Sequence, residues 1–223
     1  MQEKKGIARF IDHTLLKPTA TREDIRALCR EAREYRCAAV CVQPVFVSMC
    51  SDLLQDSGVA VATVVGFPFG TAKPEVKAFE AARAVEDGAV EVDMVASIGE
   101  ILAGNYAAVQ KDIEAVVAAV AGRALVKVII ETAYLNKEQI AETSRRVQAA
   151  GADFVKTSTG YGPRGASAED IKTIRAAVGP DFGIKASGGI SNYAKAQEML
   201  AAGATRLGAS AAAAIIAGED AWE

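Results

Sequence analysis

Eight short apolar segments, each followed by a longer amphipathic segment, run through the chain from end to end. The apolar segments are typical of buried strands and span residues 9–12, 38–42, 59–67, 89–95, 125–131, 152–156, 183–187 and 206–210. The amphipathic segments have helical periodicity and span residues 22–35, 45–54, 74–87, 105–121, 137–150, 168–178, 193–202 and 211–216. This alternation indicates a parallel sheet that helices cover on both faces.

Eight βα units are the number that closes a barrel, so the sequence predicts an α/β fold with a single (β/α)8 TIM barrel. An open, doubly wound sheet is the less favoured alternative. No low-complexity segment or linker interrupts the pattern, and we expect one catalytic barrel domain over residues 1–223. Thr21, Ser167 and Asn192 each precede a helical segment, where a helix N-cap is expected.

The composition, 51% apolar and 24% charged residues, is that of an ordinary folded protein rather than a disordered one. The net charge is −3 and no basic stripe is present, so a nucleic acid is not expected as a partner. No stretch approaches the roughly 18 apolar residues that a membrane-spanning helix needs, and residues 1–10 lack a secretory signal. We therefore expect a cytoplasmic protein without a membrane partner.

Four cysteines, Cys29, Cys37, Cys41 and Cys50, lie in one short region, which raises the question of a metal site. They show no C-x-x-C spacing, and the only histidine, His13, is distant from them in sequence. Free thiols in a reducing compartment are the favoured interpretation, and we expect no bound metal.

In a barrel of this kind the active site is built at the carboxyl ends of the strands, so polar residues there are informative. The expected strand ends carry Asp12, Cys41, Asp93, Lys156 and Lys185, together with Glu131 and Thr132 after the fifth strand. Charged groups that converge inside a barrel are costly unless they are paired, and an inert barrel seldom assembles them. These residues are candidates for a functional site, with a buried ion-pair network that has no turnover as the alternative.

Lys156 and Lys185 lie on the sixth and seventh expected strands, which are neighbours in the barrel. Each ammonium disfavours the other, so we expect one of the two lysines to have a pKa well below the ordinary value of about 10.4. A neutral lysine amine is the nucleophile of Schiff-base chemistry with carbonyl substrates. Asp93 supplies the carboxylate that proton transfer in such chemistry needs. The spacing does not decide which lysine becomes covalent.

Glycine-rich loops follow the last three expected strands: "STGYGPRG" (158–165), "ASGGI" (186–190) and "GASAA" (208–212). Glycine lets backbone N–H groups approach an anion, and the amino terminus of a helix favours negative charge. Phosphate sites in these barrels often lie after strands seven and eight. The clustering of these loops therefore predicts a phosphate-binding region.

Seven segments in the same order resemble the deoxyribose-phosphate aldolase family over nearly the whole chain. They are "DHTLLKP" (12–18), "VCVQP" (40–44), "VVGFPFG" (64–70), "EVDMV" (91–95), "KVIIETAYL" (127–135), "ADFVKTSTG" (152–160) and "KASGGI" (185–190). The resemblance implies a class I aldolase that uses no cofactor. It also implies reversible cleavage of 2-deoxy-D-ribose 5-phosphate into acetaldehyde and D-glyceraldehyde 3-phosphate, so a sugar phosphate and acetaldehyde are the expected partners.

Residue roles follow from the same resemblance. Lys156 resembles the lysine that forms the Schiff base, Asp93 the proton donor and acceptor, and Lys185 the second lysine that lowers the pKa of the first. The family's phosphate-binding positions are matched by Gly160, Gly188, Gly189 and Ser210, and Asp12 falls where a polar group meets the sugar.

Two departures from the family pattern concern the phosphate region. Ala211 and Ala212 stand where a second serine and a glycine are usual, which removes one hydroxyl contact to phosphate. Arg164 stands where glycine is frequent, and it is expected either to add charge to the phosphate site or to be solvated.

Two alternatives to the aldolase assignment stay open. One is a Schiff-base aldolase of the same fold with a different or unphosphorylated substrate, and the other is a non-catalytic barrel that binds a phosphorylated sugar. Such barrels are often dimers, so a homo-oligomer is an expectation, although no interface can be read from the sequence.

Overall fold

The computed structural model describes residues 6–220, and its strands form one closed barrel in which sequential strands pair in parallel and β8 pairs with β1. The strands are β1 (Ile11–Leu15), β2 (Ala39–Val42), β3 (Ala60–Val65), β4 (Glu91–Val95), β5 (Leu125–Ile129), β6 (Phe154–Lys156), β7 (Gly183–Ser187) and β8 (Arg206–Ala209). The predicted (β/α)8 barrel is confirmed, and the open-sheet alternative is wrong.

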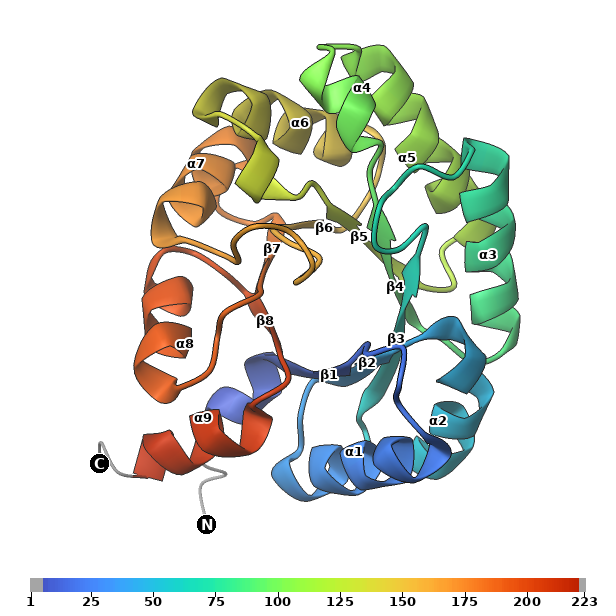
Figure 1. The fold of residues 1–223 in the computed structure, drawn as a ribbon, viewed down its shortest axis with the longest axis vertical. Coiled ribbons are helices and arrows are strands. Elements are labelled where there is room, and N and C mark those ends of the chain that lie inside the picture. Colours follow the sequence, from blue (N-terminus) through green and yellow to red (C-terminus); the bar gives the residue numbers. More distant parts are fainter. Residues whose placement is uncertain (1–5, 221–223) are drawn as a thin grey trace.

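Helices surround the barrel as an outer ring (Figure 1). They are α1 (Arg22–Tyr35), α2 (Val47–Leu54), α3 (Pro74–Glu86), α4 (Ile98–Leu102), α5 (Tyr106–Val120), α6 (Lys137–Ala149), α7 (Ala168–Val178), α8 (Tyr193–Ala201) and α9 (Ala212–Asp220). The predicted N-caps are confirmed, because the side chains of Thr21, Ser167 and Asn192 each accept a hydrogen bond from a first-turn backbone N–H. No helix in the described part of the chain is long and apolar enough to cross a membrane.

Side chains alternate between the two faces of the barrel wall, as the two-residue period of a strand requires. Outward residues such as Val92 and Met94 belong to the large apolar cluster that the strands form with the helices. The interior of the barrel is divided: apolar residues of β2 and β3, with Leu16 after β1, fill one side, and charged residues fill the other. The apolar side consists of Leu16, Ala39, Cys41, Ala62 and Val64.

The first strand differs from its prediction. Residues 9–12 were expected to be extended, but Ile7–Phe10 forms a 3-10 helix and β1 runs over Ile11–Leu15. The backbone N–H of Ile7 donates to the carboxylate of Glu219 on α9 at 3.0 Å, which ties this turn to the last helix. Asp12 is therefore the second residue of its strand and not the last, and its side chain is fully buried inside the barrel.

A buried ion pair lies behind the carboxyl end of β4. Lys77 of α3 donates to Asp112 of α5 at 2.6 Å and to the backbone carbonyl of Val95 at 2.9 Å. Both side chains of the pair are almost completely buried, so the pair holds the segment that leaves β4 from the side opposite the barrel interior.

We predict that Lys77→Met lowers the free energy of unfolding by about 3–5 kcal/mol, because the substitution leaves the Asp112 carboxylate buried without its cation. Equilibrium unfolding in urea measures this loss. The matched control is the double variant Lys77→Met/Asp112→Leu, which removes both charges and is expected to recover much of the stability. Equal stability of the wild type and the single variant would contradict the prediction.

Candidate active site

The carboxylate of Asp93, on β4, lies at the centre of a buried cluster of charges. Its Oδ2 atom is 2.7 Å from Nζ of Lys156 and 2.6 Å from Nζ of Lys185, and its Oδ1 atom is 2.8 Å from Nζ of Lys127. The lysines come from β6, β7 and β5, and all four side chains are at most 3% exposed. The barrel thus brings together the three residues that the sequence predicts as catalytic.

A second set of carboxylates lies beneath this centre. Asp12 of β1 accepts hydrogen bonds from Lys185 and, at 2.7 Å, from Nη1 of Arg206 on β8. Glu91 of β4 lies 2.6 Å from Nζ of Lys127 and 3.0 Å from Nη1 of Arg206. Asp12 is thus part of the charge cluster and supports Lys185 from below.

The cluster has one cation more than it has anions. Three carboxylates, Asp12, Glu91 and Asp93, face four cationic side chains, Lys127, Lys156, Lys185 and Arg206. A buried lysine in a cluster with excess positive charge releases its proton more readily than an exposed lysine does. If one lysine is neutral, the charges of the cluster balance.

The pKa shifts single out Lys156 as that lysine. Burial lowers the pKa of Lys156, and the ammonium of Lys185 adds to this effect, while Asp93 opposes it only in part. Burial also acts to lower the pKa of Lys185, but the attraction of Asp12 and Asp93 outweighs it and raises the pKa above its ordinary value. Lys156 is therefore disposed to act as a neutral amine, and Lys185 stays protonated.

Asp93 is held in its ionised form. Burial alone raises the pKa of this carboxyl group, but Lys127, Lys156 and Lys185 together bring it well below the ordinary range. An ionised carboxylate 2.7 Å from the amine of Lys156 can exchange a proton with groups that form at that nitrogen. The pair is thus suited to nucleophilic attack on a carbonyl carbon with proton transfer beside it.

A cavity of about 210 Å³ opens above Lys156 at the carboxyl ends of the strands. The predicted phosphate-binding residues Gly160, Gly188, Gly189 and Ser210 line it together with Thr14, Leu16, Lys156, Thr159, Ser187, Ile190, Gly208 and Ala209. Asp12, Asp93 and Lys185 do not line the cavity; they are fully buried, and Asp93 connects them to Lys156. Lys156 is the one charged side chain among the lining residues in the described part of the chain.

The loops that wall the cavity are hydrogen-bonded to one another. The backbone N–H of Ala166 donates to the carbonyls of Ser187 and Gly188, and the hydroxyl of Ser187 donates to the carbonyl of Ser158 at 2.7 Å. A Cβ atom at Gly165 would lie 2.1 Å from the carbonyl oxygen of Gly188, so only glycine allows this approach. The loops after β6 and β7 therefore form one continuous wall.

Arg164 does not add its charge to the cavity, and its side chain is 44% exposed, in agreement with the expected alternative of a solvated residue. Its guanidinium forms an ion pair with Asp170 in the first turn of α7, and its Nη2 atom donates to the carbonyl of Thr132 at 3.2 Å. Arg164 does not line the cavity. It joins the segment after β5 to the loop after β6, so its charge is used within the protein.

Sequence reasoning missed Lys127, Glu91 and Arg206 as members of the cluster. They lie at the beginning or middle of their strands, whereas the search was confined to strand ends. The alternation of inward and outward side chains along a strand would have identified two of them. Glu91 is two residues before Asp93, and Arg206 is two residues before Gly208, which also faces the barrel interior. Lys127 is the register partner of Asp93 in the β4–β5 pair, which only the paired strands reveal.

Cys41 and His13 contact other side chains of the protein. Cys41 is buried on β2 with its sulfur 3.9 Å from Oδ2 of Asp93, and burial raises the pKa of its thiol. His13 lies on β1, and its Nε2 atom is 2.8 Å from the carboxylate of Glu31 on α1. Among residues 6–220, no group of three or more His, Cys, Asp or Glu side chains could hold a metal ion.

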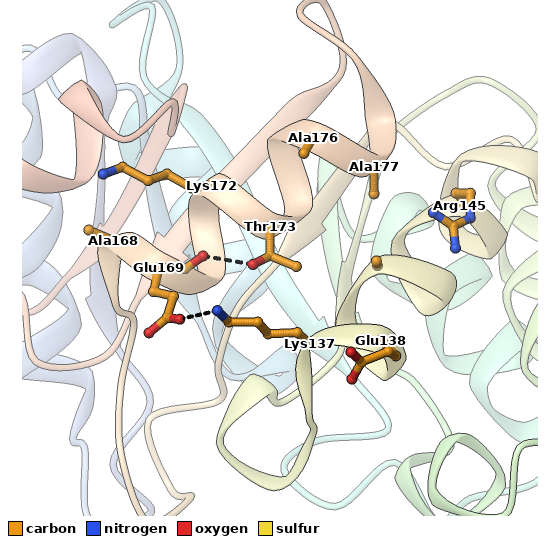
Figure 2. A pocket seen from close by; sticks show the side chains of 10 residues that line it. Lys137, Glu138, Arg145, Ala168, Glu169, Lys172, Thr173, Ala176 and Ala177 are labelled. Atoms are coloured by element: carbon orange, nitrogen blue, oxygen red, sulfur yellow. Dashed lines mark hydrogen bonds and ion pairs between the residues drawn. The ribbon is translucent and has the colours of Figure 1, made fainter.

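A larger hollow, of about 840 Å³, lies on the outside of the barrel between α6 and α7. Figure 2 shows its alanine-rich surface and the ion pair between Lys137 and Glu169 that crosses it at 2.5 Å. None of the charged side chains of the barrel interior lines this hollow. The chemistry of the cluster is accessible through the smaller cavity at the barrel mouth.

Known proteins are similar to this chain in sequence and in fold. A curated deoxyribose-phosphate aldolase from Halalkalibacterium halodurans is 53% identical over 216 residues, which cover 96% of each chain. Deoxyribose-phosphate aldolase 1 from Bacillus licheniformis is 53% identical over 214 residues, again 96% of each chain. The solved tetrameric deoxyribose phosphate aldolase from Aeropyrum pernix superimposes with a TM-score of 0.90 at 35% identity, covering 97% of this chain and 92% of that one.

The model of the DeoC/LacD family aldolases matches residues 7–223. The match covers almost the entire chain. The chain belongs to the DeoC/LacD family of aldolases.

Proposed function

We propose that the protein reversibly cleaves 2-deoxy-D-ribose 5-phosphate into acetaldehyde and D-glyceraldehyde 3-phosphate through an imine on Lys156. The observation that carries the proposal is that Lys156, whose pKa is lowered, reaches the cavity from a buried cluster centred on Asp93. The names of the curated relatives support the same reaction. A barrel that only binds a phosphorylated sugar has no need of an amine activated in this way.

Each residue of the cluster has a role in this reaction. The neutral amine of Lys156 attacks the aldehyde carbon of the open-chain sugar, and loss of water from the carbinolamine gives the imine. The C3 hydroxyl then loses its proton, the C2–C3 bond breaks, and its electron pair flows into the protonated imine. Asp93 transfers protons at these steps, while protonated Lys185 keeps Asp93 in place and ionised.

The glycine loops are proposed to hold the 5-phosphate. Gly160, Gly188 and Gly189 all adopt positive φ values between 76° and 87° and line the cavity together with Ser210. Because Ala211 and Ala212 offer no hydroxyl, backbone N–H groups supply most of the proposed contacts, aided by the start of α9 at Ala212. The alternative, an unphosphorylated substrate, is favoured by the same two alanines.

We also propose that the protein forms a homo-oligomer, because the relative from Aeropyrum pernix is described as tetrameric. The described part of the chain exposes several large apolar side chains, among them Phe69, Val76 and Phe79. Light scattering during size-exclusion chromatography measures the mass in solution.

We predict that reduction with borohydride in the presence of acetaldehyde attaches an ethyl group to Lys156, since only a neutral amine forms the imine that borohydride reduces. Peptide mass mapping identifies the modified residue. Lys156→Ala is expected to abolish both the adduct and retro-aldol turnover. An adduct on another lysine in the wild type, or turnover by Lys156→Ala, would refute the assignment of the nucleophile.

Lys185→Leu is expected to move the pH dependence of imine formation upward. The variant loses the neighbouring ammonium and releases Asp93 to pair more strongly with Lys156, and both changes raise the pKa of Lys156. Because the neutral amine is the reactive form, the rate of imine trapping then rises at higher pH than in the wild type. Trapping rates measured as a function of pH test this, and an unchanged midpoint would exclude the role assigned to Lys185.

Asp93→Asn is expected to lower kcat by about 10²–10⁴, the usual scale for one acid–base group, with a much smaller change in KM. Steady-state kinetics on the sugar phosphate measure both constants, and circular dichroism verifies that the variant folds. A folded variant with wild-type kcat would show that proton transfer does not depend on this carboxylate.

A further inference from the structure

Glu131 is a buried acid beside the cavity that the proposed mechanism does not use. It lies between β5 and the 3-10 helix Thr132–Tyr134, and it is 2% exposed. Its backbone has φ 48° and ψ 67°, in the left-handed region that residues with long side chains seldom adopt. Such a conformation persists only where the surroundings hold it, and it is frequent at functional sites.

The carboxylate of Glu131 is directed at the loop that follows β6. Its Oε2 atom accepts hydrogen bonds from the backbone N–H of Thr159 at 3.1 Å and from the hydroxyl of Thr159. The Oγ1 atom of Thr159 in turn accepts from the backbone N–H of Tyr161 at 3.0 Å. One carboxylate oxygen therefore orients the turn Thr159–Gly160–Tyr161, whose first two residues line the cavity.

The rest of this loop is closely fitted to the same acid. A Cβ atom at Gly162 would lie 2.9 Å from Cδ of Glu131, so the backbone passes directly over the carboxylate. On the other side of the turn, the hydroxyl of Tyr161 donates to the carbonyl of Leu16 at 2.9 Å, and its ring meets that of Phe67 edge to face. Figure 1 shows the segment between β6 and α7 reaching toward the centre of the ring.

We propose that Glu131 is a positioning residue for phosphate recognition, which it controls through Thr159. The inference rests on the proposed function. No arginine lines the cavity in the described part of the chain, and its one lysine is the proposed nucleophile. Phosphate binding must then depend on neutral donors, namely hydroxyl groups such as that of Ser210 and backbone N–H groups, and Glu131 sets the direction of the backbone N–H groups in the wall at Gly160. Its side-chain hydrogen bonds within residues 6–220 both go to Thr159 and none to the Asp93 cluster.

The test compares kcat/KM for 2-deoxyribose 5-phosphate with kcat/KM for 2-deoxyribose. In Glu131→Ala we expect the ratio of these two constants to fall about tenfold, mainly through a higher KM for the phosphorylated sugar, which is the scale of losing a hydrogen bond to a charged group. Glu131→Gln keeps an oxygen that can accept from Thr159, and it is expected to retain most of the ratio. Thr159→Val removes only the hydroxyl and is expected to shift the ratio in the same direction as Glu131→Ala.

Glu131→Gly separates the carboxylate from the backbone, because glycine adopts the left-handed conformation without strain. In Glu131→Gly the ratio of the two kcat/KM values is expected to fall as it does in Glu131→Ala. A ratio restored to the wild-type value would assign the effect to backbone strain and overturn the proposal. An equal loss on both sugars, or loss of acetaldehyde trapping on Lys156, would also overturn it, since acetaldehyde has no phosphate. A wild type that cleaves both sugars equally well would instead refute the phosphate assignment itself, so the two failures are distinguishable.

Discussion

The shared carboxylate of Asp93 is the interaction on which the site depends. The amino nitrogens of three lysines lie 2.6–2.8 Å from its two oxygens, in a barrel interior where an isolated charge would be costly to bury. In the cluster, the attraction between opposite charges offsets the free-energy cost of removing each of them from water. A closed parallel barrel makes this arrangement accessible, because alternate residues of β4 to β7 point to a common axis although they are far apart in sequence. The cluster must respond to substitution as a unit.

The position of each lysine in this cluster explains why only one of them is disposed to react. Lys185 is bonded to both Asp12 and Asp93, whereas Lys156 is bonded to Asp93 alone and also reaches the cavity. Removing a proton from Lys156 therefore breaks the weaker set of interactions and brings the charge of the cluster to zero. The sequence indicates that two lysines meet, but repulsion between them is secondary here, since burial is the largest cause of the lowered pKa of Lys156.

The periodicity of apolar residues correctly predicted the elements that bury one face. It failed where the chain passes from one type of secondary structure to another within an apolar segment. Helices α1 (Arg22–Tyr35) and α7 (Ala168–Val178) begin and end where the sequence predicts, because polar caps mark their starts. Residues 9–12 look like a strand, but Phe10 ends a 3-10 helix and Ile11 begins β1, and two adjacent apolar residues do not show where one element gives way to the other. The short helix α4 (Ile98–Leu102) was missed because five residues are too few to show a helical period. The role of Arg164 depended on Asp170, a partner that no local pattern identifies.

The site has two parts with different origins. The reacting groups lie on the strands, where the closed barrel and the mutual pairing of buried charges leave little freedom to change one residue. The cavity wall lies in the loops after β6, β7 and β8, outside the strands that carry the reacting groups. With a net charge of −3, the protein offers no overall attraction for a phosphorylated sugar, so its selectivity must come from the placement of loop N–H groups. Strand motifs therefore identify the reaction more sharply than they identify the substrate.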